Sequence, residues 1–334
     1  MQMPTWEWSL PTKIIFGAGT RGRLPEFLEG KRAALVRSKS VGDVPGSFIG
    51  EFSGIRPNPT KQNVADCAAF IRDTQAEIVV ALGGGSVLDC AKAAADGMPL
   101  VAMPTTSGTG SEVTSVCVLS DEDAGTKFSI ASPDFYPSIA IVDSELTYTV
   151  PRKVAAESGL DALAHAMEAL WSIRGNPAST AIALRAVRLV LDDLEHACEG
   201  GSAARDNMSL ASLLAGMAFS QSKTAGCHAC ANPLTVGYGL SHGESCAFTL
   251  AAFTRINNMD RHAKALEFEN ASALADKIDG MKAALGLPLT LAQAGIPQED
   301  LPKLAEACLL PPNMRNNPVT MDRASMLALF ESLG

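Results

Sequence analysis

The feature that most constrains the fold is a change of apolar pattern at Pro151. Before this residue, short β-branched runs alternate with helix-like stretches such as 61–73 and 87–95. Continuous apolar runs of this kind predict the strands of a parallel sheet that is covered on both faces. The predicted strands are 13–16, 32–36, 78–82, 100–103 and 138–143. We therefore expect an α/β domain over residues 1–150.

After Pro151 the chain is rich in Ala, Leu, Met and Glu, and β-branched runs almost vanish. Apolar residues recur at helical spacing, which predicts helices rather than strands. The boundary is marked by Pro151 itself, because proline suits the first turn of a new helix. The predicted helices are 155–171, 178–198, 203–220, 247–256 and 263–285. We therefore expect an all-helical domain over residues 151–334.

Charge and composition exclude several classes of protein. The net charge is −9 and no Lys/Arg run is longer than a pair, so a surface that neutralises nucleic-acid phosphates is not expected. No basic and apolar leader opens the chain, and no apolar run approaches the ~18 residues of a membrane helix. The eight cysteines are too scattered for a disulfide framework. We expect a cytoplasmic protein with reduced thiols and no membrane or nucleic-acid partner.

Two glycine-containing loops are candidates for binding a pyrophosphate. Residues 83–86 (Gly-Gly-Gly-Ser) follow the strongest predicted strand and open a helix, and residues 104–112 follow the next strand. Glycines let backbone N–H groups approach an anion, and a helix N-terminus favours negative charge. Residues 17–22 also match G-x-G-x-x-G, but no acidic residue follows the second strand as a Rossmann fingerprint requires. We interpret residues 17–22 as a glycine turn after an edge strand.

The helical half contains a candidate metal-binding set. Asp161 and His165 are four residues apart on a predicted helix, so both side chains lie on one face. His228 and His242 stand on either side of a predicted break at Pro233 and the glycines that follow it. One carboxylate and three imidazoles suit Fe²⁺, Zn²⁺, Co²⁺ or Ni²⁺ better than Ca²⁺ or Mg²⁺.

Other residues near this set have simpler interpretations. Glu168, one turn beyond His165, is a candidate partner that orients a ligand. His196 and His262 lie in charged stretches and are interpreted as solvated side chains. The C-x-x-C at 227–230 has no second pair, so we do not interpret it as a structural zinc site.

The sequence resembles the iron-containing (group III) alcohol dehydrogenases over nearly its whole length. The glycine loops and residues 16–19, 57–60 and 92 stand where that family has them. The most specific stretch matches the family signature in residue type and spacing, at Asp143, Pro151, Ala156, Ser158, Asp161 and Glu168. The resemblance implies a dehydroquinate synthase-like architecture, with a Rossmann-like parallel sheet, an all-helical C-terminal domain and a nicotinamide cofactor between them.

The resemblance also implies roles for individual residues. The metal, Fe²⁺ or Zn²⁺, would be held by Asp161, His165, His228 and His242. Residues implied to line the cofactor are Asn58, Gly84, Gly85, Ser86, Asp89, Thr105, Thr106, Lys127 and Leu146. The metal would act as a Lewis acid on the substrate oxygen during hydride transfer, so no catalytic side chain beyond the metal site is required.

Three departures from the family pattern refine these expectations. Ser38, between Arg37 and Lys39, replaces the acid that accepts a ribose hydroxyl, so we predict NADP(H) over NAD(H). Asn232 replaces a second His of the late pair, which leaves no proton relay there. Only residues 93–103 separate Lys92 from the second loop, and this compactness is similar to that of the phosphonoacetaldehyde reductases (hydroxyethylphosphonate dehydrogenases).

We therefore expect an enzyme that interconverts a small aldehyde and its primary alcohol, with phosphonoacetaldehyde and 2-hydroxyethylphosphonate as a candidate pair. The alternative is a Zn-dependent polyol dehydrogenase or a dehydroquinate synthase-like lyase of the same superfamily. The lyase needs several basic residues around its metal, and the neighbourhood of His228 offers only Lys223. Candidate pocket residues are Thr109, Ser111, Cys117, Cys227, Asn232, Tyr238 and Arg315. An edge strand over residues 6–16 is expected to pair across a homodimer.

Overall fold

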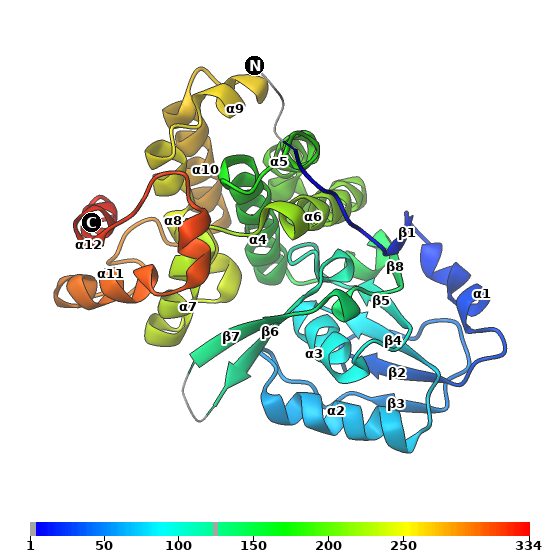
Figure 1. Ribbon diagram of the computed structural model, residues 1–334. Coiled ribbons are helices and arrows are strands. Elements are labelled where there is room, and N and C mark those ends of the chain that lie inside the picture. Colours follow the sequence, from blue (N-terminus) through cyan, green and yellow to red (C-terminus); the bar gives the residue numbers. More distant parts are fainter. Residues whose placement is uncertain (1–4, 123–125) are drawn as a thin grey trace.

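The first part of the molecule is a parallel β-sheet. The computed structural model describes residues 5–122 and 126–334. Six strands form the sheet: β1 (Lys13–Phe16), β2 (Ala33–Arg37), β3 (Gly50–Phe52), β4 (Ile78–Gly83), β5 (Leu100–Pro104) and β8 (Ile139–Val142). Their order is β1-β8-β5-β4-β2-β3, and each neighbouring pair is parallel (Figure 1). The carboxyl ends of the strands therefore lie at one edge of the sheet.

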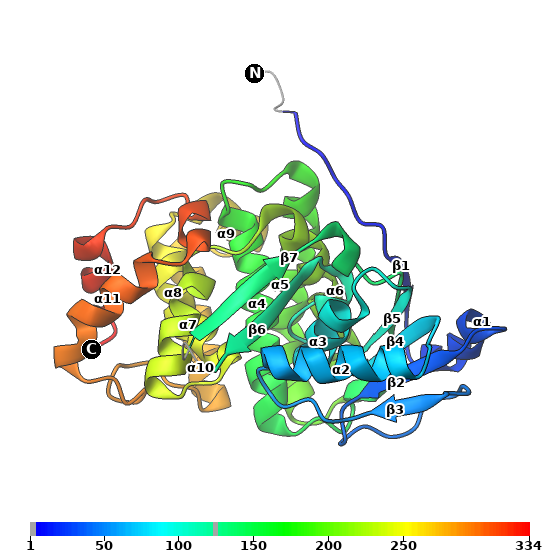
Figure 2. The same ribbon diagram turned by 60° about the horizontal axis from the view of Figure 1, so that its bottom comes forward.

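Both faces of the sheet are covered, as the apolar runs predict. The helices of this region are α1 (Leu24–Leu28), α2 (Lys61–Asp73) and α3 (Gly85–Ala95). All six residues of β4 are buried. Val79 and Ala81 pack in one apolar cluster with α2 and α3, while Val80 and Leu82 pack on the other face in a cluster with α1. Figure 2 shows α2 lying along the sheet. The α/β expectation is confirmed.

A β-hairpin that the sequence analysis missed projects from this region. It consists of β6 (Val116–Asp121) and β7 (Thr126–Ala131), which pair antiparallel. In Figure 1 it extends from the sheet region toward α7 (Gly226–Tyr238), and β7 contacts that helix. Ten of its twelve residues are exposed or partly exposed, so it lacks the continuous apolar run by which the buried strands were recognised.

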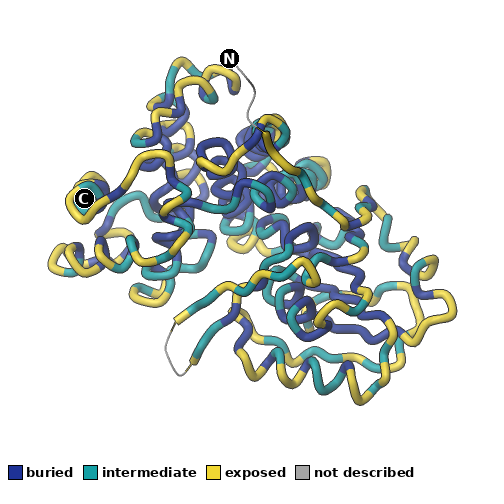
Figure 3. Tube along the Cα trace, in the orientation of Figure 1, coloured by how far each residue is buried: buried dark blue, intermediate teal, exposed yellow. Residues whose placement is uncertain are grey.

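The remaining elements are helices. They are α4 (Arg152–Trp171), α5 (Pro177–Cys198), α6 (Ser202–Ser222), α7, α8 (His242–Ile256), α9 (Asp260–Ala265), α10 (Ala271–Leu285), α11 (Leu301–Leu309) and α12 (Arg323–Glu331). Short 3₁₀ turns are η1 (Thr20–Arg23), η2 (Ser111–Val113), η3 (Pro133–Phe135), η4 (Ser144–Thr147), η5 (Gln298–Asp300) and η6 (Pro312–Asn316). One large apolar cluster unites most of these helices. Helix α4 lies at its centre, since every residue from 159 to 171 is buried (Figure 3). Charged side chains on α4 therefore need partners.

Two helix boundaries differ from the sequence prediction. The single helix expected over 263–285 is wrong, because α9 and α10 are separate. Glu267 has φ 69°, a left-handed conformation that ends the first helix, and the Asn270 side chain caps the second. The break expected over Pro233, Gly237 and Gly239 is confirmed only at Gly239. Pro233 lies inside α7, which continues to a left-handed Gly239.

The N-terminal segment also differs from expectation. Strand β1 begins only at Lys13, and residues 5–12 form no strand. Ser9 instead exchanges hydrogen bonds with the Gln221 side chain at the end of α6. The expectation of an edge strand over 6–16 is therefore correct only for its last four residues.

The two regions touch through a close backbone contact. Gly110, in the loop after β5, has φ +58°, and a Cβ at this position would lie 2.5 Å from Cα of Gly216 on α6. Glycine is needed at both positions because the loop and the helix meet without side chains between them. Val113 and Leu213 extend this contact in a small apolar cluster. Within the described ranges, no helix has the length and apolarity that a membrane crossing requires.

Candidate active site

The structure brings the four predicted metal ligands together. Asp161 and His165 lie one turn apart on α4, His228 is in the first turn of α7, and His242 is the first residue of α8. Oδ1 of Asp161 lies 3.8 Å from Nδ1 of His165, 3.5 Å from Nε2 of His228 and 3.7 Å from Nε2 of His242. Three helices that are distant in sequence therefore deliver donors to one point.

These separations fit a shared divalent ion. Tetrahedral ligands about 2.1 Å from a metal lie roughly 3.4 Å from one another, close to the distances found here. Asp161 Oδ1, His165 Nδ1 and His228 Nε2 are buried and have no hydrogen-bond partner among the described residues. Leaving such atoms unsatisfied costs about 1–3 kcal/mol each, and a cation bound between them would satisfy all three. The residues present therefore fit a metal.

Protonation favours the ligating forms of Asp161 and His165, whereas Cys246 raises the pKa of His242 and, against the effect of burial, that of His228, so these two imidazoles lose a proton when a metal binds. Burial alone would raise the pKa of Asp161, but the imidazoles of His165 and His242 hold that pKa below its ordinary value. Burial lowers the pKa of His165 to about 4. A carboxylate and a neutral imidazole are the forms that bind metals, so Asp161 and His165 need not lose a proton near neutral pH.

Glu168 orients one of the ligands. Its carboxylate is fully buried and lies 2.6 Å from Nδ1 of His228, and it also accepts hydrogen bonds from the backbone N–H groups of Ala225 and His228. Burial opposes ionisation of Glu168, but these contacts lower its pKa. A proton on Nδ1 of His228 leaves the lone pair of Nε2 directed toward Asp161.

Cys246 is a residue that the sequence analysis missed. Its sulfur, with donor atoms of Asp161, His228 and His242, belongs to a group of four atoms that all lie within 4.8 Å of one another. Cys246 is fully buried, and its Sγ lies 3.9 Å from Nε2 of His242. It follows His242 by one helical turn, the same spacing that revealed Asp161 and His165. Applying that spacing to every His would have identified it.

The predicted cofactor residues gather at the carboxyl edge of the sheet. Ser38, Gly84, Thr105 and Leu146 follow β2, β4, β5 and β8 respectively. Gly84 caps α3 without a side-chain hydrogen bond, so the N-terminal N–H groups of that helix are available to an anion. Open α/β sheets bind ligands at this edge.

The two glycine loops pack directly on each other. A Cβ on Gly85 would lie 2.6 Å from Cγ2 of Thr109, and one on Gly84 would lie 3.2 Å from Oγ1 of Thr106. Ser86 joins them to Asn58, whose backbone N–H donates to the Ser86 hydroxyl. Glycine is therefore needed where the two loops meet, and Gly84, Gly85 and Ser86 remain partly exposed; we call these two loops the predicted cofactor cradle.

Lys127 extends the cofactor residues toward the metal site. It lies on β7, where burial lowers the pKa of its ammonium group and the charge of Cys246 opposes that shift. The hairpin thus brings a half-buried cation within electrostatic range of α8. This placement depends on an element that local sequence patterns did not predict.

Several predicted site residues have other tasks. Asp89 accepts hydrogen bonds from the Ser111 hydroxyl (2.5 Å) and the Val118 N–H (2.8 Å), so both its oxygens hold the second loop and the hairpin in place. Ser111 also binds the buried Lys92 ammonium, and Cys117 is fully buried in the same region. Ser111 and Cys117, which were predicted to line a substrate pocket, are therefore both buried.

Two further sequence interpretations change. Tyr238 donates to Asp300 and is thereby tied to the segment before α11. Arg37 is nine-tenths buried, donates to the carbonyls of Val41 and Gly42, and pairs with Asp43 at 3.1 Å. The expected pair of cations beside Ser38 is therefore reduced to the exposed Lys39.

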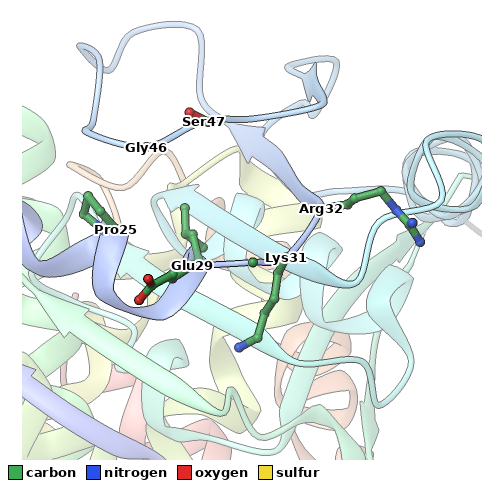
Figure 4. Close-up of a pocket in the computed structure, with 8 residues that line it drawn as sticks. Pro25, Glu29, Lys31, Arg32, Gly46 and Ser47 are labelled. Carbon is green, nitrogen blue, oxygen red and sulfur yellow. The ribbon is translucent and has the colours of Figure 1, made fainter.

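A separate depression of about 680 Å³ lies between α1, the start of β2 and the loop at Gly46 and Ser47 (Figure 4). Its charged side chains, Glu29, Lys31 and Arg32, are exposed and point in different directions. Binding sites need convergent polar groups, which this depression does not provide.

A glycine cradle on a parallel sheet, facing a buried carboxylate–imidazole cluster in a helical region, defines a metal-dependent nicotinamide oxidoreductase. The chain belongs to the iron-containing alcohol dehydrogenase family: the model "iron-containing alcohol dehydrogenase" matches residues 11–144, and "Fe-containing alcohol dehydrogenase family, C-terminal" matches 155–334. It is therefore an alcohol/aldehyde oxidoreductase that uses a metal and a nicotinamide cofactor.

Individual relatives agree with this assignment. The chain is 33% identical to 1,3-propanediol dehydrogenase of Klebsiella pneumoniae over 99% of both chains. It is 36% identical to 1-propanol dehydrogenase PduQ of Salmonella typhimurium, over 98% of this chain and 99% of that one. Sulfoacetaldehyde reductase from Bifidobacterium kashiwanohense, solved with NAD⁺, superposes with a TM-score of 0.92 at 34% identity over 99% of both chains.

Proposed function

We propose that this enzyme interconverts a small aldehyde and its primary alcohol with NADP(H), using Fe²⁺ or Zn²⁺ held by Asp161, His165, His228 and His242. The observation that carries the proposal is the convergence of these side chains, from three helices, with three buried donor atoms that lack partners. Buried donor atoms without a partner call for an explanation, and one bound cation would supply it for all three.

Different residues of the protein would hold the metal, orient a metal ligand and bind the cofactor. When bound, the metal supplies Lewis acidity toward the oxygen of a carbonyl or alcohol. Glu168 holds the His228 ring in one tautomer and orientation, and the buried position of α4 limits access of water. Gly84 and Gly85 leave backbone N–H groups open to the cofactor phosphates. No side chain needs to act as a nucleophile.

Within this function, we propose an aldehyde with an anionic tail, such as phosphonoacetaldehyde. Arg174, Lys223 and Arg315 lie on three segments that hydrogen bonds join: the Ile173 N–H donates to Asn316, and the Asn316 side chain donates to Thr224. Among the described residues none of the three cations forms an ion pair with a carboxylate. The similar sulfoacetaldehyde reductase acts on a two-carbon aldehyde whose tail is also an anion.

The preference for NADP(H) rests on Ser38. Its hydroxyl replaces the carboxylate that would repel a 2′-phosphate, and the exposed Lys39 follows it. Arg37 supplies no free charge there, and the similar reductase was solved with NAD⁺, so both cofactors belong in the test. We expect Ser38→Asp to shift the ratio of kcat/KM for NADPH over NADH toward NADH by at least about tenfold.

The test of the whole proposal is NADPH oxidation by anaerobically Fe²⁺-loaded protein across short aldehydes, phosphonoacetaldehyde and sulfoacetaldehyde included, with NADH in parallel. Arg315→Ala should raise KM for the anionic aldehydes and leave KM for propanal unchanged. Equal KM values for charged and neutral aldehydes would remove the anionic tail from the proposal. If protein shown to hold metal oxidised neither NADPH nor NADH with any of these aldehydes, the result would instead favour the lyase-like branch.

We also propose a homodimer. Strand β1 lies at the edge of the sheet, and exposed edges tend to be covered by pairing. Sedimentation equilibrium of the full chain should give twice the mass of one chain, and a monomer would contradict this proposal.

A further inference from the structure

The strongest feature that the proposed function leaves unused is Cys246. Its sulfur lies 3.9 Å from Nε2 of His242, and tetrahedral sulfur and nitrogen ligands of one zinc ion lie roughly 3.6 Å apart. The thiol is fully buried on α8, one turn beyond His242. It is therefore directed at the same point as the imidazoles of His228 and His242.

A second observation is that two other donor atoms at this point have no hydrogen-bond partner among the described residues. Asp161 Oδ1 and His228 Nε2 are both buried, unpaired among the described residues and members of the same group of four donor atoms as Cys246 Sγ. His165, the remaining predicted ligand, stacks on the ring of Phe219 with centroids 4.1 Å apart. The side chains thus offer a thiol in addition to the expected oxygen and nitrogen donors.

We propose that Cys246 is a metal ligand of this enzyme and that its sulfur shifts the metal preference of the site toward Zn²⁺ and away from Fe²⁺. This inference rests on the proposed metal site. As the sulfur–metal bond forms, the S–H bond breaks and its proton is released to solvent, with no change of oxidation state. Thiolate is a softer ligand than carboxylate or imidazole, so it favours zinc over ferrous iron when both are available.

Co²⁺ is the probe that separates this proposal from a purely structural thiol. A thiolate bound to Co²⁺ gives a near-ultraviolet sulfur-to-cobalt charge-transfer band, whereas nitrogen and oxygen ligands give only the weaker visible bands. We expect the charge-transfer band in the Co²⁺-loaded wild type and its loss in Cys246→Ser, with the visible bands retained. Cys227→Ala is the matched control, because Cys227 is equally buried beside His228 but lies outside the group of donors.

Metal competition gives the second measurement. Cys246→Ser should lower the ratio of Zn²⁺ to Fe²⁺ affinity by about tenfold, while Cys227→Ala leaves it unchanged. Near-ultraviolet circular dichroism checks that both variants are folded. Visible Co²⁺ bands without a charge-transfer band in the wild type would overturn the role of Cys246 alone. No bound Co²⁺ in folded wild type would overturn the metal site and this inference together.

Discussion

The α/β region and the helical region build their parts of the active site in opposite ways. In the α/β region, the predicted cofactor cradle is mainly backbone, and nearby polar side chains such as Asp89 and Lys92 are bonded within the protein. In the helical region, buried donors of Asp161, His165 and His228 have no partner among the described residues. The predicted anion site offers backbone N–H groups where side chains are absent. The predicted cation site instead brings together side-chain donor atoms that have no partner among the described residues.

This difference has an energetic cause. A phosphate is recognised by N–H groups that every residue carries, so glycine at the right place suffices. A divalent cation needs several deprotonated side chains, and holding them together without the ion is costly. We therefore expect metal binding to stabilise the helical region, while the α/β region should be stable without its ligand.

The largest effect is expected from His228→Ala. Removing a direct ligand should lower metal affinity and kcat/KM by more than about 100-fold, since loss of a mere supporting partner already costs 10–100-fold. NADPH binding, measured by fluorescence, should be unchanged because the cradle belongs to the other region. His196→Ala, on an exposed histidine of α5, should keep its metal. Loss of NADPH binding in His228→Ala would contradict the conclusion that the cofactor loops bind NADPH independently of the metal ligands.

Glu168→Gln should have the next largest effect. The amide retains one acceptor, but its NH₂ group faces the N–H donors of Ala225 and His228. We expect metal affinity to fall by about 10–100-fold and the free energy of unfolding to fall by about 1–3 kcal/mol. Chelator competition and urea unfolding measure these quantities. Glu244→Gln is the control, because glutamine serves equally in the capping box with Ser241; equal losses in both variants would contradict a specific role of Glu168.

Gly85→Ala tests the other side of the comparison. The new methyl group would meet Thr109 at 2.6 Å, so the two loops must separate, at a cost of about 1–3 kcal/mol in the free energy of unfolding. We expect KM for NADPH to rise and metal content to stay unchanged. Adding Thr109→Ala, which removes the closest atoms, should restore part of both losses. A fall in metal content in the single variant would show that the regions are not independent.

The smallest effect on turnover is expected from Glu112→Gln, in the loop where the regions meet. Burial raises the pKa of Glu112 to about 7, against opposing effects of its backbone and Lys92. Between pH 4.5 and about 7, the folded state therefore keeps a proton on Glu112 that the unfolded chain has lost. The contribution of Glu112 to wild-type stability should therefore be greatest below the ordinary value of 4.5 and fall as the pH rises toward about 7, by at most about 1.4 kcal/mol per pH unit.

Glu112→Gln carries no such proton, so its stability should lack this decline. Urea unfolding of both proteins across this pH range measures the difference. Parallel curves would show that Glu112 is ionised in the folded protein. Activity of the metal-loaded variant should match the wild type, since Glu112 is not among the predicted metal or cofactor residues.

How far the sequence predicts this molecule depends on the range of the interactions involved. Buried strands such as β4 and the helix α2 were predicted within about one residue, because their signals are local: continuous apolar runs, and the Thr60 cap. The hairpin β6–β7 was missed because most of its residues are exposed or partly exposed. Pro233 was read as a break, yet the helix tolerates it, and Arg37 was expected free but is bonded by the loop that follows it.

The sequence by itself determined the α/β fold followed by helices, the glycine loops and the types and spacing of four candidate ligands. These properties follow from periodicity and from side-chain chemistry, which can be recognised from the order of the residues alone. Only the tertiary structure decided that His228 is supported by Glu168, that Cys246 joins the donors and that Lys127 reaches toward α8. The physical reason is that these relations join residues from different elements, and their distances are set by packing rather than by separation along the chain.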